Sequence, residues 1–426
     1  MWNRLAATLT LVAVSVSLRA GDASQQPVFR AGVDLVVVDV QVVDASGAPV
    51  TGLEPSHFSV RIDGRRRTVM SAELLQSSSG ASPLLRRAPG GPTAQNVWPA
   101  AADTPVRTFV LGVDTGSFTM GDGAAVTRSV TGFVDQLSPA DPVGVVALPR
   151  GVVLRPTLDR HSVRQSIETL TGQAGQRANP RHLSVTEVVD IAAELERDAI
   201  VTMAGRGGRG QLMTTQQVLR QVQARECSGA MDQACLQEIV MEAEAQARDM
   251  EDRVAESLDG LKRLLRLLAD YPGRKTVVLM SAGMPASDRA GGWHRDGSEA
   301  RALGQAAALA SATVYALHID TGYRPVTSAE VRSPRAAVSL GRERELQQRL
   351  LADFAGASGG ALIAAPTDAG EQALARVLRE TSAYYALGIV AEPRDLDGRA
   401  HPLRVDVSYP GAIVRSGRYV VPRAVR

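Results

Sequence analysis

The chain has 426 residues, of which 44% are hydrophobic and 4% aromatic, a composition typical of a soluble α/β protein with two or three domains. Lysine and arginine number 47 and aspartate and glutamate 45, so the net charge is only +2. This balance provides no general field that would attract nucleic acid or an anionic membrane surface. We therefore expect a globular protein that has no nucleic-acid partner.

The first 23 residues have the three parts of a secretory signal peptide. Arg4 supplies positive charge, residues 5–18 are uncharged and mostly apolar, and Ala20 or Ala23 offers a small residue for cleavage. The apolar segment is too short to span a membrane comfortably. We expect a mature protein that is secreted or periplasmic and that has no membrane span after cleavage.

Residues 29–76 have the pattern of a small antiparallel β module. The segment 33–43 is rich in β-branched residues, and 58–64 alternates apolar with polar residues before an Asp-Gly turn. The following segment, 77–105, is rich in Ser, Gly, Pro and Ala and has no periodic apolar pattern. It is interpreted as a linker.

Residues 106–381 alternate between strand and helix patterns, which predicts an α/β domain. Such an alternation favours a mostly parallel sheet with helical crossovers. We expect strands at 108–113, 143–148, 276–280, 313–319 and 361–364, and helices at 124–137, 162–170, 298–311, 343–357 and 371–380.

A helical insertion is predicted at about 185–270, because five leucines form one apolar face between residues 258 and 268. Its sequence contains both cysteines of the chain, Cys227 and Cys235, between helix-like flanks. Outside the cytoplasm these residues are expected to form a disulfide that closes a small loop between two helices. A metal site is the weaker interpretation, because neither a histidine nor a further cysteine lies nearby.

Residues 382–426 return to a β pattern, with strand-like segments at 384–390, 403–409 and 413–421. A β segment therefore stands at each end of the α/β domain. We hypothesise that the two segments pack together into one sandwich, with the α/β domain inserted between them.

Polar residues follow three of the predicted parallel strands. Asp114 and Ser117 follow the first, Ser281 follows 276–280, and Asp320 follows 313–319. Ligand sites in open α/β sheets form at the carboxyl ends of the strands. These four residues are therefore the candidate binding residues.

The chain resembles the von Willebrand factor type A (VWA) domain proteins, in particular a secreted bacterial group described as VWFA-related acidobacterial-type proteins. The order and spacing of several short segments make the resemblance specific. These segments are 58–64, 114–117, 141–148, 272–283, 355–360, 382–388 and 415–419. The resemblance implies a VWA-like (Rossmann-like) fold with helices on both faces of the sheet.

Members of the wider fold commonly bind Mg²⁺ through an Asp-x-Ser-x-Ser loop, a Thr on a second loop and an Asp after a later strand, a ring of oxygen ligands that suits this ion. Here Asp114 matches the first ligand, but Gly116 and Phe118 occupy the serine positions and Ala282 replaces the later Asp. The segment 171–177 has no Thr in a clear position. The resemblance thus implies a degenerate metal-ion-dependent adhesion site without a cofactor. If a metal binds, its ligands are Asp114, Ser117 and Ser281.

A hydrolase is the chemically sharper alternative, because Asp-Thr-Gly occurs at both Asp114 and Asp320, as in aspartic proteases. Two close carboxylates that share a proton would be needed. Such enzymes have nearly all-β lobes, whereas 216–269 has a helical pattern.

We therefore expect a non-catalytic module that binds a partner protein through 114–120, 281–287 and 320–324. Mg²⁺-dependent adhesion through Asp114 and an aspartic-type hydrolase remain the alternatives.

Overall fold

A computed structural model describes residues 35–76, 107–175, 179–195, 215–228, 232–289, 293, 297–321, 337–366 and 369–422. All of them lie in one compact unit, 34–426. The predicted signal peptide and the predicted linker lie outside the described residues. No helix among the described residues is long and apolar enough to cross a membrane.

The central element is a six-stranded sheet with the order β10-β9-β8-β5-β6-β7. Its strands are β5 (Thr108–Asp114), β6 (Val143–Leu148), β7 (Gly151–Thr157), β8 (Lys275–Ser281), β9 (Ala312–Asp320) and β10 (Leu362–Pro366). All neighbours pair in parallel except β6 and β7. Strands β5, β6 and β8 are buried along their whole length, which explains their continuous apolar sequences.

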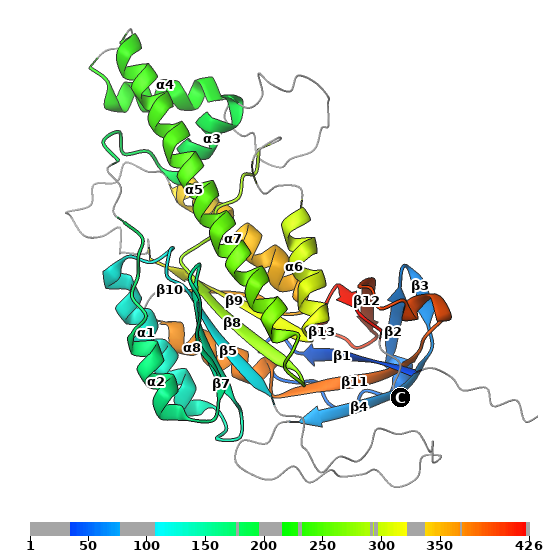
Figure 1. Ribbon diagram of the computed structural model, residues 1–426. Coiled ribbons are helices and arrows are strands. Elements are labelled where there is room, and N and C mark those ends of the chain that lie inside the picture. The colour runs from blue at the N-terminus through cyan, green and yellow to red at the C-terminus, as the bar shows by residue number, and fades with distance from the viewer. Residues whose placement is uncertain are drawn as a thin grey trace, which may run out of the picture. The chain divides into compact units, whose positions relative to one another are not determined.

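Helices cover both faces of this sheet (Figure 1). One apolar core joins it to α1 (Met120–Gln136), α2 (Arg160–Glu168) and α8 (Gly370–Glu380). A second core joins its other face to α5 (Gln233–Leu268), α6 (Ser298–Leu309) and α7 (Ala337–Ser358). The predicted fold class is therefore confirmed.

The structure differs from the predicted elements at one edge strand of the central sheet and at the start of one helix. Strand β7 is not predicted, because its side chains do not alternate between core and solvent and Val152 and Val153 are both exposed. Helix α1 begins four residues before the predicted start, since Gly121 and Gly123 weaken its helical pattern. The Thr119 side chain caps it by accepting a hydrogen bond from the Asp122 N–H.

The two terminal β segments form two antiparallel sheets, each of which contains strands from both ends of the chain. One sheet has the order β13-β1-β11-β4 and the other the order β14-β12-β2-β3. The strands are β1 (Leu35–Val43), β2 (Phe58–Ile62), β3 (Arg65–Arg67), β4 (Val69–Gln76), β11 (Ala383–Val390), β12 (His401–Val407), β13 (Ile413–Arg415) and β14 (Tyr419–Val420).

One apolar core joins these sheets, with Val38 and Val40 from β1, Val60 from β2 and Leu387 from β11 among its buried residues. The hypothesis of a shared sandwich is therefore confirmed. The sandwich also contacts the α/β domain, because the buried Tyr315 hydroxyl donates a hydrogen bond to Gln41 Oε1 at 2.9 Å.

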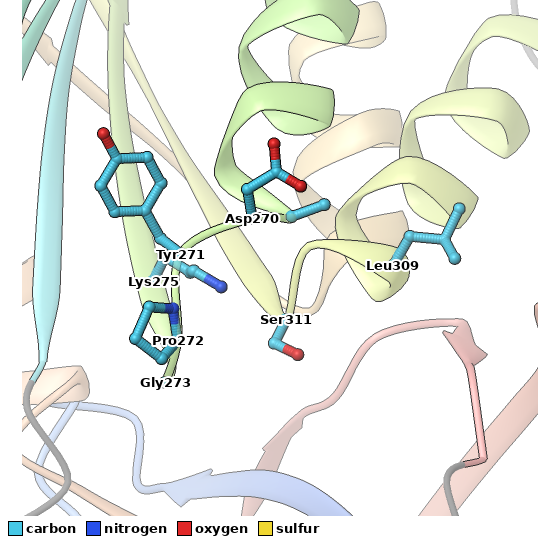
Figure 2. A pocket seen from close by; sticks show the side chains of 8 residues that line it. Asp270, Tyr271, Pro272, Gly273, Lys275, Leu309 and Ser311 are labelled. Carbon is cyan, nitrogen blue, oxygen red and sulfur yellow. The ribbon is translucent and has the colours of Figure 1, made fainter.

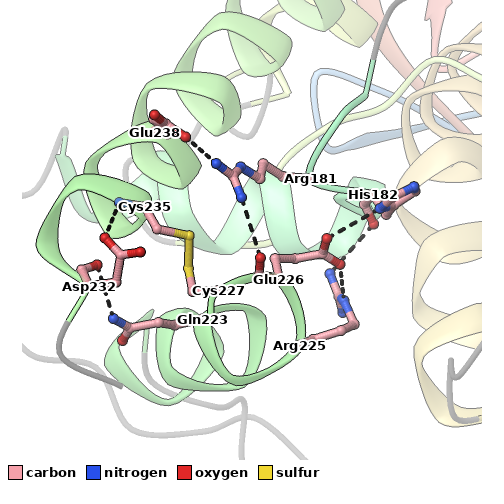
Figure 3. The surroundings of a disulfide bond; sticks show 9 residues. All are labelled: Arg181, His182, Gln223, Arg225, Glu226, Cys227, Asp232, Cys235 and Glu238. Carbon is pink, nitrogen blue, oxygen red and sulfur yellow. Dashed lines mark hydrogen bonds and ion pairs between the residues drawn. A yellow bond between two sulfur atoms is a disulfide. The ribbon is translucent and has the colours of Figure 1, made fainter. Parts of the chain in front are cut away.

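The helical insertion consists of α3 (Val185–Leu195), α4 (Thr215–Glu226) and the first half of α5. Its own apolar core includes Ile191, Val222 and Ile239, and it extends to Trp293 and to Leu346 of α7. Cys227 and Cys235 form a disulfide between α4 and α5, as predicted (Figure 3).

Candidate functional site at the carboxyl edge of the sheet

Three of the four predicted binding residues come together where β5 and β8 end. Val113 lies opposite Met280 in the register of these strands, so Asp114 and Ser281 are neighbours. The chain turns sharply after Asp114, and the Ser117 N–H and hydroxyl both donate to the Asp114 carbonyl oxygen, at 3.0 and 2.8 Å. This turn brings the Ser117 hydroxyl within 3.4 Å of Ser281 Oγ.

The Asp114 carboxylate is 2% exposed and both of its oxygens accept hydrogen bonds. Ser281 Oγ donates to Oδ2 at 2.8 Å and Ser257 Oγ donates to Oδ1 at 2.9 Å. Burial raises the pKa of Asp114 to about 6, while the hydrogen bonds from Ser281, Ser257 and Ser117 act in the opposite direction. The carboxylate is thus enclosed by serine hydroxyls.

Ser257 is the member of this cluster that the sequence interpretation missed. It lies in α5, on the buried face formed by Val254, Leu258 and Leu261. A single serine within an otherwise apolar helix face is the signal that could have revealed it, because buried hydroxyls need hydrogen-bond partners. Through Ser257 the helix that begins in the insertion reaches the carboxyl edge of the sheet.

Two further segments close around this cluster. The Gln173 and Ala174 N–H groups donate to the carbonyls of Thr115 and Phe118, each at 2.8 Å. A Cβ atom at Gly172 would lie 2.1 Å from the Thr119 carbonyl oxygen, so only glycine allows this close approach. Ala282 donates its N–H to Ser117 Oγ at 2.9 Å.

Asp320 does not join the cluster. It ends β9, and β8 lies between β9 and β5. Two strand spacings separate β5 from β9, roughly 10 Å. The Asp320 carboxylate accepts a hydrogen bond from Arg344 Nε at 2.7 Å, whereas Asp114 is bonded to serines. Asp114 and Asp320 therefore do not form a proton-sharing pair, and the hydrolase alternative is not favoured.

The residues present do not suit Mg²⁺. The cluster offers one carboxylate, and its other oxygen donors are the hydroxyls of Ser117, Ser257 and Ser281, two of which donate to that carboxylate. A hard divalent cation needs a fuller set of oxygen ligands in open geometry. In the parts of the chain that the structure describes, no three His, Cys, Asp or Glu side chains gather where they could hold a metal ion.

A buried charge cluster that the sequence does not reveal lies between the insertion and this edge. Arg342 of α7 donates to both oxygens of Asp190 in α3, at 2.7 and 2.6 Å. It also donates to both oxygens of Asp288, each at 2.9 Å. Arg289 adds an ion pair to Asp190 at 2.6 Å. These contacts hold α3 against α7 and the segment after β8.

A pocket lies at the start of β8, at the opposite end of the strand from the candidate site (Figure 2). The Lys275 ammonium donates to the Ala310 carbonyl at 2.7 Å, and Asp270 and Tyr271 line the same pocket. None of the four predicted binding residues lines it. The pocket therefore gives no support to the predicted binding edge.

The buried state of Asp114 predicts a specific pH dependence. Because its pKa is higher in the folded chain than in the unfolded chain, folding takes up a proton between about pH 4 and pH 6. As the pH rises from about 4 to about 6, the free energy of unfolding of the wild-type protein should fall by up to about 3 kcal/mol relative to that of Asp114→Asn. Above about pH 6 the difference between the two proteins should stay constant.

Urea denaturation of both proteins between pH 3.5 and pH 7.5 measures this difference, and other titrating groups cancel in the comparison. A difference that does not change with pH would show that Asp114 titrates alike in the folded and unfolded chains.

No protein-family model matches the chain, and no curated protein matches it. Among solved structures it is similar to the conserved hypothetical protein BatB from Bacteroides thetaiotaomicron, with 11% identity and a TM-score of 0.32 over 65% of this chain and 98% of that chain. An aerotolerance-related membrane protein from Bacteroides fragilis has 11% identity and a TM-score of 0.28 over 64% of this chain and 97% of that chain.

Proximal thread matrix protein 1 from the mussel byssus, described with a zinc-occupied MIDAS motif, gives 9% identity and a TM-score of 0.19 over 68% of this chain and 98% of that chain. With TM-scores this low, the function has to be inferred from the geometry of this chain itself.

Proposed function

We propose that the chain is a secreted or periplasmic VWA-like module that binds a partner protein at the carboxyl edge of its sheet without a metal ion and without catalysis. One observation carries the metal-independent part of the proposal. Ser257 and Ser281 already occupy both oxygens of the Asp114 carboxylate, which is almost completely buried. A bound metal would have to displace these hydrogen bonds.

The binding surface is supported by the residues that remain accessible around the closed cluster. Met120 follows the Asp114 turn and is 77% exposed, although Phe118 beside it is fully buried. Exposed methionine is typical of protein interfaces. Residues 322–324 of the predicted surface lie outside the described residues. The proposal therefore rests on Met120 and on the half-buried residues Ala282, Gly283 and Pro285 that follow β8.

The location outside the cytoplasm is supported by the disulfide between Cys227 and Cys235. Disulfides persist in oxidising compartments and are rare in the cytosol. The same bond ties the end of α4 to the start of α5, and α5 continues to Ser257.

Capture of partners by the immobilised mature protein tests the proposal. We expect the same proteins to be retained from the extracytoplasmic fraction in Mg²⁺ and in chelator. Met120→Asp should reduce capture at least about tenfold, which corresponds to 1.4 kcal/mol. Met241→Asp changes a methionine of similar exposure, 68%, on α5 and should have no effect. Release of the partner by chelator would contradict metal independence.

Thermal unfolding gives an independent prediction. A metal that binds the folded state at one hundred times its dissociation constant would stabilise it by about 2.7 kcal/mol. We expect millimolar Mg²⁺, Mn²⁺ or chelator to leave the melting temperature unchanged, both in the wild-type protein and in Asp114→Asn. A metal-dependent rise that disappears in the variant would instead establish the adhesion-site mechanism.

A further inference from the structure

The edge strands of the three sheets differ in how well they are protected from pairing with another chain. In the described parts of the chain, β3, β13 and β14 have at most three residues each. Strand β10 ends in Pro366, and β7 contains Pro156 and pairs irregularly with β6. Short length, proline and irregular pairing are the usual devices that block edge-to-edge association.

Strand β4 is neither short nor interrupted by proline. It has eight residues, Val-Met-Ser-Ala-Glu-Leu-Leu-Gln, without proline, lysine or arginine. It pairs antiparallel with β11 along its whole length, with one irregularity near Gly388, and it is the outer strand of its sheet (Figure 1). Alternate residues of such a strand direct their N–H and C=O groups away from the sheet, ready to pair.

The side chains of β4 define what kind of strand would fit beside it. Ala72 and Leu74 face the sandwich core but remain only half-buried. On the opposite face Glu73 is exposed and lies in register with Ala386 and, one strand further, with the exposed Asp39. Of these two carboxylates, Glu73 lies on the outer strand β4 and Asp39 on the inner strand β1, so Glu73 is the nearer one to an added strand.

We propose that the outer edge of β4 binds an extended segment of a partner protein in which apolar and basic side chains alternate. Main-chain hydrogen bonds to β4 would hold the segment. Its apolar side chains would lie beside Ala72 and Leu74, and a basic side chain would lie opposite Glu73. This surface belongs to the sandwich and is separate from the carboxyl edge of the parallel sheet.

Synthetic peptides test the proposal with the full mature protein. One probe alternates Val and Lys over about nine residues, and the other alternates Val and Glu. Fluorescence anisotropy should show preferential binding of the Val-Lys peptide. Glu73→Lys should weaken that binding about two- to thirtyfold, because it turns a cross-strand attraction into a repulsion, and should strengthen binding of the Val-Glu peptide. Glu251→Lys, an exposed position on α5, should change neither.

Residue-resolved amide exchange locates the contact. In the free protein alternate amides of β4 should exchange rapidly, and the Val-Lys peptide should slow them while leaving β7 unchanged. The proposal is overturned if those β4 amides are already protected in the free monomer, since the chain itself then covers the edge. It is also overturned if the protein is a dimer that Glu73→Lys dissociates, or if the peptides bind regardless of charge.

Discussion

Arg342→Met will lower the free energy of unfolding by about 3–5 kcal/mol, the range found when one partner of a buried ion pair is removed. The Arg342 side chain is 19% exposed and holds Asp190, which is 5% exposed, and Asp288, which is 13% exposed. Burial alone would lower the pKa of Arg342, but hydrogen bonds to Asp190 and Asp288 raise it above its usual value. The variant leaves Asp288 without its main partner. Asp190 loses Arg342 but keeps its ion pair with Arg289.

The loss should appear first in the helical insertion. Asp190 lies in α3, and the core of the insertion extends to Leu346 on the same helix as Arg342. Limited proteolysis should therefore cut the insertion faster in the variant, while the sandwich stays resistant. Arg248→Met is the control, because Arg248 is an exposed residue of α5 that pairs with Glu244 on the same helix, and its loss should cost at most about 1 kcal/mol. Equal losses in the two variants would show that the cluster contributes no special stability.

The central sheet could be predicted from the sequence because its strands are buried on both faces. The continuous apolar sequences of β5, β6 and β8 record that burial directly. Strand β4 could not be assigned in this way. Its Met, Ala, Glu, Leu and Gln residues favour helix intrinsically. Pairing with β11, more than 300 positions later in the chain, imposes the strand.

The candidate site likewise has a part that the sequence predicts and a part that depends on contacts between distant segments. The grouping of Asp114 with Ser281 could be predicted because residues that end parallel strands lie at the same edge of a sheet. The contacts of Ser257 and Asp190 depend on how the insertion folds back on the sheet, which no local pattern records. The separation of Asp320 from Asp114 likewise depends on β8 lying between their strands.

The second large effect is expected in the sandwich, where Arg67→Met should also lower the free energy of unfolding by about 3–5 kcal/mol. Arg67 ends β3, and its guanidinium donates to both oxygens of Asp395 at 2.8 and 2.7 Å. The two side chains are 2% and 0% exposed. Hydrogen bonds from Arg67 lower the pKa of Asp395 against the opposing effect of burial. The variant therefore leaves a buried carboxyl group without the partner that stabilises its charge.

The double variant Arg67→Met/Asp395→Leu separates the cost of an orphaned charge from the value of the pair itself. Replacing both partners of a buried ion pair with apolar residues is often neutral or stabilising, so the double variant should recover most of the loss. Equilibrium urea unfolding of the wild-type protein, the two single variants and the double variant measures the coupling. If the double variant is as unstable as Arg67→Met, the ion pair itself supplies the stability. Because Arg67 and Asp395 come from opposite ends of the chain, the pair would then be a direct link that closes the sandwich around the inserted α/β domain.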